Sequence, residues 1–121
     1  MDDLKSLLEK IGSVADFAGI DVVDANTLGL CKSAPLHVAA VWGDCEAITL
    51  LVEAGAFIDQ RGEDGFTPLM EAVAQGHKDA VDLLISLGAA PLRNDDGQLP
   101  SDYARVGGNE ELSQLLARRG Y

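Results

Sequence analysis

The side chains in this sequence that could carry out chemistry are few and scattered. The 121 residues include two imidazoles, His37 and His77, and two thiols, Cys31 and Cys45. Catalysis would need one of these beside a second reactive group in a cleft, paired carboxylates, or a phosphate-binding loop, and the sequence shows none of these patterns. Neither cysteine has Cys or His neighbours at metal-ligand spacing. We therefore predict a protein that is not an enzyme and that holds no cofactor and no metal.

The net charge of the sequence excludes some classes of binding partner. The sequence has 9 basic and 20 acidic residues, a net charge of −11, which repels nucleic-acid phosphates and anionic lipid headgroups. We expect another protein, basic in character, as the partner, with no nucleic acid and no membrane. The start, Met1 to Leu4, carries acidic residues where a secretory signal would be positive, and no apolar run approaches the roughly 20 residues of a membrane span. A cytoplasmic location with free thiols is the expectation.

Three copies of one pattern fill most of the chain. From Pro35 onward, the same residue types return after 33 positions, as Pro68, Ala72, Gly76, Leu83, Leu84, Gly88 and Ala89. A degenerate third copy follows at a spacing of 32, with Pro100, Ala104, Gly108, Leu115, Leu116 and Gly120. A fixed period of this length indicates stacked supersecondary units.

The second copy predicts a helix, a tight turn and another helix. Thr67-Pro68 is typical of a helix start, because the hydroxyl caps free N–H groups and proline at the first position loses no hydrogen bond. Gly76 suits the end of that helix. A second helix is predicted from Lys78 to Leu87, and Asp64-Gly65 predicts a turn before the pair. Such short helices are stable only when packed against neighbouring copies.

The pattern G-x-T-P-L-x-x-A, followed by glycine, L-L and G-A, resembles the ankyrin repeat over about residues 30–121. The resemblance implies an all-α fold, an ankyrin-repeat solenoid of stacked antiparallel helix pairs with projecting β-turn fingers, used to bind proteins. It also implies that His37 braces its turn through a structural hydrogen bond. We divide the single domain, 1–121, into a divergent N-terminal cap at 1–29, repeats at 30–61 and 62–94, and a C-terminal capping repeat at 95–121.

Departures from the pattern predict local differences. The first copy has Ala34 in place of the capping threonine and Cys31-Lys32 in place of Asp-Gly, so we expect an irregular finger. The third copy has Leu99 for threonine and Ser101 for leucine, and its polar end suits a cap whose outer face meets water.

The N-terminal 30 residues fit the repeat poorly. Asp3 is a candidate cap for a helix with an apolar stripe of Leu4, Leu7, Leu8 and Ile11. Residues 14–23 match no copy and make up most of an insertion of about ten residues, as judged from the 17-residue spacing in the repeats. Whether this segment, which contains Phe17, binds a partner or only connects the cap is left open.

Partner-binding residues are expected at the finger tips and on the exposed side of the first helix of each pair. The candidates are Ser33, Val38, Val41, Trp42, Arg61, Glu63, Asp64, Phe66, Glu71, Ala74, Gln75, Asp96, Gln98, Tyr103 and Val106. Trp42 is the sole tryptophan and fits a binding hot spot or a cover over the insertion. Phe66 likewise fits partner contact or stacking on the next finger. Together with Tyr103 they suggest an apolar patch with an acidic rim.

These features predict a non-catalytic protein-binding module that is monomeric when free. We favour an acidic inhibitor of a basic partner, for example a bacterial toxin-immunity protein, because charge steers such complexes together quickly. The alternative is a generic scaffold or regulatory adaptor, whose affinity would change little with salt.

Overall fold

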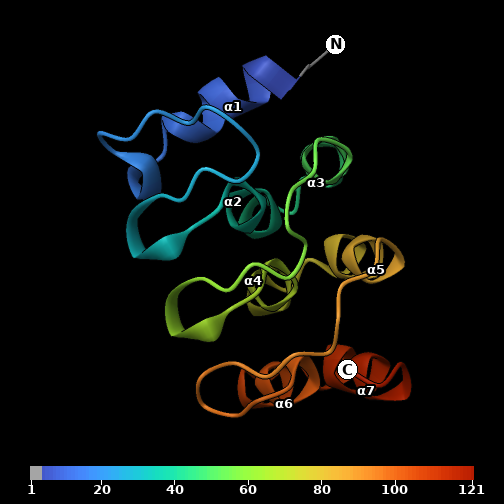
Figure 1. Ribbon diagram of the computed structural model, residues 1–121. Coiled ribbons are helices and arrows are strands. Elements are labelled where there is room, and N and C mark those ends of the chain that lie inside the picture. The colour runs from blue at the N-terminus through green and yellow to red at the C-terminus, as the bar shows by residue number, and fades with distance from the viewer. Residues whose placement is uncertain (1–3) are drawn as a thin grey trace.

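Stacked helix pairs make up the computed structural model, which describes residues 4–121 (Figure 1). The helices are α1 (Leu4–Gly12), α2 (Pro35–Trp42), α3 (Cys45–Glu53), α4 (Pro68–Gln75), α5 (Lys78–Ser86), α6 (Pro100–Val106) and α7 (Glu110–Arg118). In Figure 1, α2, α4 and α6 form one column and α3, α5 and α7 another. Residues 4–121 contain no strand, and the predicted all-α solenoid of helix pairs is confirmed. None of the described helices is long and apolar enough to cross a membrane.

Loops that we call fingers project from the α2, α4 and α6 column on the side away from the other column (Figure 1). We define the finger-side face as the surface formed by these three helices and the fingers at 29–33, 62–66 and 94–98. Each finger is closed by the same backbone hydrogen bond, from Gly29 N to Ser33 O (2.7 Å), Gly62 N to Phe66 O (2.8 Å) and Asn94 N to Gln98 O (3.0 Å).

Apolar side chains fill the space between the columns and between successive pairs. Leu51 and Leu84, from the paired leucines of the two full copies, are completely buried. Ala39 and Ala72 are also completely buried, so their small side chains allow close approach between neighbouring helices. The repeat pattern therefore predicted these core positions correctly.

Helix ends follow the predicted local signals. Thr67 Oγ1 accepts a hydrogen bond from Met70 N at 3.3 Å, and Gly76 ends α4 with a φ of 72°. In the first copy, Ala34 has no hydroxyl, and His37 compensates because its Nδ1 accepts the Ala34 N–H at 3.0 Å. The proton of His37 is then on Nε2, which donates to Phe66 O of the next finger at 2.9 Å. The predicted bracing role of His37 is confirmed.

The second imidazole also joins successive pairs. His77 Nε2 donates to Val41 O at 2.9 Å, linking the turn before α5 to the end of α2. Gly43 makes this approach possible, because a Cβ at that position would lie 2.6 Å from the His77 ring. Both histidines are therefore framework residues that connect neighbouring repeats.

The first finger is regular, so the prediction of an irregular finger is wrong. Cys31 and Lys32 have φ values of 57° and 62°, and Asp64 and Gly65 in the second finger have 58° and 74°. The closing hydrogen bond within 29–33 holds the left-handed backbone although neither residue is glycine. Such conformations cost a non-glycine residue about 1–2 kcal/mol each, which the surrounding contacts must offset.

Replacing Lys32 by glycine should therefore stabilise the protein. Glycine adopts the φ of 62° without steric strain, and part of the gain is cancelled by its larger unfolded-state entropy, leaving an expected increase of up to about 1 kcal/mol. Urea denaturation measures this change in the free energy of unfolding. Lys78→Gly, at the start of α5, is the matched control and should give no gain, because that residue is right-handed helical.

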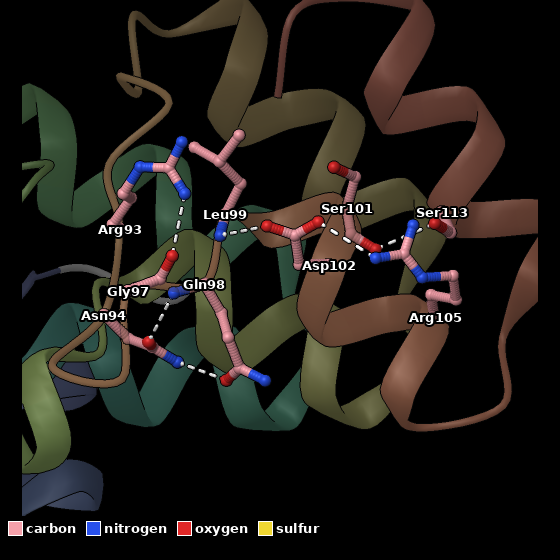
Figure 2. A network of polar contacts seen from close by, with 9 residues as sticks. All are labelled: Arg93, Asn94, Gly97, Gln98, Leu99, Ser101, Asp102, Arg105 and Ser113. Carbon is pink, nitrogen blue, oxygen red and sulfur yellow. Dashed lines mark hydrogen bonds and ion pairs between the residues drawn. The ribbon is translucent and has the colours of Figure 1, made fainter.

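The third copy replaces the missing threonine cap and leucine with polar contacts (Figure 2). Asp102 Oδ2 accepts the Leu99 N–H at 3.0 Å, which supplies a cap from within the helix. Ser101 is buried, and its carbonyl accepts a hydrogen bond from Ser113 Oγ at 2.8 Å, which ties α6 to α7.

The N-terminal segment is packed onto the first repeat. Leu7, Leu8 and Ile11 of α1 are buried, which confirms the predicted apolar stripe, whereas the proposed Asp3 cap lies outside the described residues. Phe17 is completely buried in the inserted segment. Asn26 attaches the later part of this segment to the loop that follows α3, since its side chain donates to Gly55 O (3.0 Å) and accepts from Phe57 N (2.9 Å). The Phe17 ring is therefore a core group.

Candidate protein-binding site

A hollow of about 150 Å³ lies on the finger-side face, where α2 and α4 meet the N-terminal segment. Its lining is Val14 and Asp16 from the insertion, His37, Val38, Val41 and Trp42 from α2, and Glu71 from α4. The volume is below the roughly 300–1,000 Å³ of small-molecule sites, and suits a single side chain of a partner. We call this feature the acidic hollow.

The carboxylates of Asp16 and Glu71 lie beside the apolar walls of the acidic hollow. Burial of Glu71, reinforced by the negative charges of Asp16 and Glu63, raises the pKa of its carboxyl above the ordinary range. Within residues 4–121, the side-chain ion pairs are Arg105–Asp102 and Arg119–Asp82, and neither reaches these groups. The site therefore holds excess negative charge without a salt bridge in the described structure.

Acidic residues of the second finger extend the negative charge of the acidic hollow toward the first finger. Glu63 is the main cause of a raised pKa at the Cys31 thiol, with smaller contributions from Asp16 and Asp64. Cys31 is an exposed free thiol, so its raised pKa disfavours the reactive thiolate. Its environment shows that acidic groups from the insertion and the second finger lie close to the first finger.

Asp16 is placed by a short 3₁₀ turn, Ala15–Phe17, whose buried Phe17 ring anchors it. Ser33 Oγ, in the first finger, donates to Asp16 Oδ2 at 3.1 Å, so this predicted contact residue helps to orient the carboxylate. Gly29 allows the close approach, since a Cβ there would lie 2.4 Å from the Asp16 carbonyl oxygen.

Trp42 lies at the end of α2 and is half-buried. Lys10 Nζ of α1 is 4.9 Å from the centroid of its ring, a distance at which a cation is attracted to the aromatic face. Val41 beside it is exposed, but Val38 is buried, and the expectation that Val38 is exposed is wrong. Val14 of the N-terminal segment, which the repeat pattern does not describe, lines the same hollow as Val38.

The other two aromatic candidates form a pair. The rings of Phe66 and Tyr103 meet edge to face, with centroids 5.0 Å apart and an interplanar angle of 85°. Both are half-buried, and exposed Gln75 lines a second hollow beside Tyr103. The structure thus brings Phe66 and Tyr103 together, while Trp42 contributes to the acidic hollow.

Several finger residues already have partners within the chain. Arg61 Nη1 donates to Gly65 O (3.3 Å) of its own finger and to Arg93 O (2.7 Å) before the next one. Gln98 Oε1 accepts from Asn94 Nδ2 at 2.9 Å in the third finger (Figure 2). Arg61 and Gln98 therefore help to shape the fingers.

The remaining candidates are exposed to solvent. Glu63 and Asp64 lie in the second finger and Asp96 in the third, while Ala74 and Val106 lie on α4 and α6. They are therefore available to a partner.

Sequence reasoning left open whether the insertion that carries Val14 and Asp16 binds a partner, and it did not single out these two residues or Lys10 of the cap. The repeat offered no framework for placing them, because the segment matches none of the three copies. The excess of carboxylates was visible in the sequence, but the convergence of Asp16 with Glu63 and Glu71 depends on tertiary packing.

His37 borders the acidic hollow and should make the stability of the protein depend on pH. Burial lowers the pKa of its imidazole below the ordinary value of about 6.5. As the pH falls below about 6.5, the unfolded chain binds a proton that the folded chain does not, and stability is lost. Glu71 acts in the opposite sense, since its pKa is raised in the folded state.

The contribution of His37 is isolated by comparing the wild type with His37→Gln from about pH 7.5 to pH 5.5 in urea denaturation. The variant should be less stable at pH 7.5, and the difference should shrink as the pH falls. A difference that stays constant over this range would contradict the buried neutral imidazole.

Comparison with known proteins agrees with this architecture. The profile of the family described as ankyrin repeats (3 copies) matches residues 3–95 and 36–121. The chain is 43% identical over 96 residues to human protein phosphatase 1 regulatory subunit 27, covering 78% of this chain and 60% of that protein. It is 32% identical over 87 residues to mouse Rabankyrin-5, covering 70% of this chain and 7% of that protein.

A bacterial relative is also similar over a shorter stretch. The chain is 40% identical over 57 residues to a putative ankyrin repeat protein of Rickettsia bellii, covering 46% of this chain and 24% of that protein. The chain thus spans 60% or less of the length of each of these relatives. Three repeat copies, stacked helix pairs and the family profile agree: the chain belongs to the ankyrin-repeat family.

Proposed function

We propose that this chain is a non-catalytic binding module that takes up a basic segment of another protein on its finger-side face. Membership of the ankyrin-repeat family supports binding to a protein. The observation that carries the proposal is the acidic hollow, where apolar walls adjoin Asp16 and Glu71 without a salt bridge in residues 4–121. Desolvated apolar contact would supply affinity, and the carboxylates would select a basic partner and speed association.

The comparisons favour the regulatory-adaptor form of this function. The human relative is named as a regulatory subunit of protein phosphatase 1, which supports a role in controlling another protein rather than in catalysis. The relatives named above include no toxin-immunity protein, so the narrower hypothesis of an acidic toxin inhibitor is supported by the net charge of −11 alone. Cytoplasmic location and a monomeric free state stay predictions.

We propose a contact surface centred on the acidic hollow and the second finger. Val41, Trp42, Glu63 and Glu71 lie at its centre, with the Phe66–Tyr103 ring pair at one side. We place the remaining candidate residues at the edge of this contact surface. We also propose that the chain is divided into a cap at 1–29 and three repeat copies.

Affinity capture with charge-reversed variants tests the proposal. The bait is the full chain, incubated at low and high salt with lysate from the organism that encodes it, and captured proteins are identified by mass spectrometry. Glu63→Lys/Glu71→Lys reverses two charges on the finger-side face. Glu53→Lys/Glu111→Lys, at exposed positions on α3 and α7, makes the same charge change on the other column.

The wild type and the α3/α7 variant should capture the same basic protein, and the finger-side variant should lose it. Raising the salt concentration should weaken capture, because the interaction depends on charge. Equal capture by both variants would contradict the proposed face. Salt-insensitive capture of neutral proteins would support a generic scaffold. Circular dichroism confirms that both variants are folded.

A further inference from the structure

We infer that the acidic hollow holds the side chain of an arginine from the partner's basic segment. This inference rests on the proposed function and identifies the chemical group that the site recognises. Its observations are the size of the hollow, the nature of its walls, and the placement of two carboxylates and an indole around it.

The hollow fits one long side chain with an apolar stem. Its volume is about 150 Å³, and Val14, Val38 and Val41 supply aliphatic surface from two separate segments. Arginine and lysine both bury their methylene groups against such surface while the charged end stays near polar groups. A purely apolar side chain would also fit the walls, but it would leave the adjoining carboxylates desolvated without a partner.

The carboxylates distinguish a basic side chain from an apolar one. Asp16 comes from the inserted segment and Glu71 from α4, so they reach the hollow from different elements. Asp16 Oδ2 accepts from Ser33, and among residues 4–121 no hydrogen bond is made to Oδ1, which can accept one from a ligand. Burial and the nearby Asp16 and Glu63 charges raise the pKa of Glu71, so an arriving cation would favour its ionised form.

The indole favours arginine over lysine. A guanidinium is planar, stacks on aromatic faces and presents five N–H donors, whereas an ammonium is a compact, strongly hydrated charge. A guanidinium therefore offers both a flat face for the Trp42 indole and N–H donors for the carboxylates that line the same hollow. Lys10 Nζ lies over the Trp42 ring, 4.9 Å from its centroid, so an arriving guanidinium would either displace this ammonium or contact another part of the indole.

A nuclear magnetic resonance titration of the full chain tests the inference without knowledge of the natural partner. The probe is arginine blocked as an N-acetyl amide, compared with equally blocked lysine and citrulline. Citrulline has nearly the shape of arginine and no charge. The signals followed are the Trp42 indole N–H and the methyl groups of Val14, Val38 and Val41, with all other assigned signals as a map of specificity.

Blocked arginine should shift these four groups of signals in a saturable way. Blocked lysine should bind more weakly, and blocked citrulline should produce no saturable shift. Glu71→Gln should weaken arginine binding by about threefold to tenfold, the range expected for removing one charge-assisted contact. Glu53→Gln, which removes the same charge from an exposed position on α3, should leave the affinity unchanged.

Equal binding of arginine and lysine, saturable binding of citrulline, or shifts centred elsewhere would overturn the inference. So would an affinity that Glu71→Gln does not change, since the spectrum of the variant shows directly whether it is folded. If blocked arginine fails to bind while Glu63→Lys/Glu71→Lys still abolishes capture of a basic protein, the arginine inference fails and the proposed function stands. If arginine binds the hollow but no protein is captured, the proposed function fails.

Discussion

Replacing Phe17 by alanine should lower the free energy of unfolding by about 3–5 kcal/mol, the range for removing a large aromatic ring from a core. The ring is completely buried and belongs to the same apolar core as Ile11 and Leu36. It also anchors the turn that carries Asp16, so the variant should bind a basic partner more weakly. Urea denaturation measures the first effect, and titration with the captured partner measures the second.

Phe57→Ala is the matched control, because Phe57 is 62% exposed and the same atoms are removed from the surface. Its expected cost is below about 1 kcal/mol, since little burial is lost. Equal destabilisation by the two variants would show that the inserted segment is not packed as described. That result would also remove the support for Asp16 in the acidic hollow.

Replacing Leu84 by alanine should cost about 2–5 kcal/mol, since Leu84 is completely buried in α5. This is a large share of the roughly 5–15 kcal/mol that stabilises a typical domain. Because each repeat is stable only against its neighbours, the loss should affect the whole array. Equilibrium denaturation followed by circular dichroism measures this loss of stability, and the denaturation midpoint should fall.

Leu28→Ala provides the comparison at a leucine that is 45% exposed. We expect a loss of less than about 1 kcal/mol there, because Leu28 is exposed and does not belong to the buried core. An unchanged midpoint for Leu84→Ala would refute its place in the core and the repeat alignment on which that place depends.

The repeats could be predicted because their signals are local and recur at a fixed period. Thr67 capping α4, Gly76 ending it and Leu84 packing beneath it each follow from residue type and spacing. The resemblance to ankyrin repeats predicted that His37 stabilises its turn through a structural hydrogen bond. The hydrogen bonds to Ala34 and Phe66 confirm that assignment.

The first finger was predicted incorrectly because its geometry is imposed by contacts rather than by its own residues. Cys31 and Lys32 have little intrinsic preference for positive φ, yet they adopt the backbone of Asp64 and Gly65. The hydrogen bond from Gly29 N to Ser33 O closes the loop as it does in the neighbouring finger. Tertiary structure thus overrides local preference at this position.

The acidic hollow could be predicted only in part. Val41, Trp42 and Glu71 occupy positions at which the repeat pattern predicts exposure, and the pattern identified them as candidates. Val14 and Asp16 come from a segment without a repeat counterpart, so no alignment to the other copies could place them. Their contribution follows from burial of Phe17, which local sequence does not reveal.

Photo-crosslinking in living cells tests most directly whether the finger-side face binds a partner. A photoreactive amino acid is placed at Val41, which is exposed and borders the acidic hollow, and in a matched control at Glu53 on α3. We predict a covalent adduct between the Val41 derivative and a basic protein, absent from the Glu53 derivative and reduced by excess wild-type chain. An adduct formed only from Glu53, or the same adduct from both positions, would contradict the account.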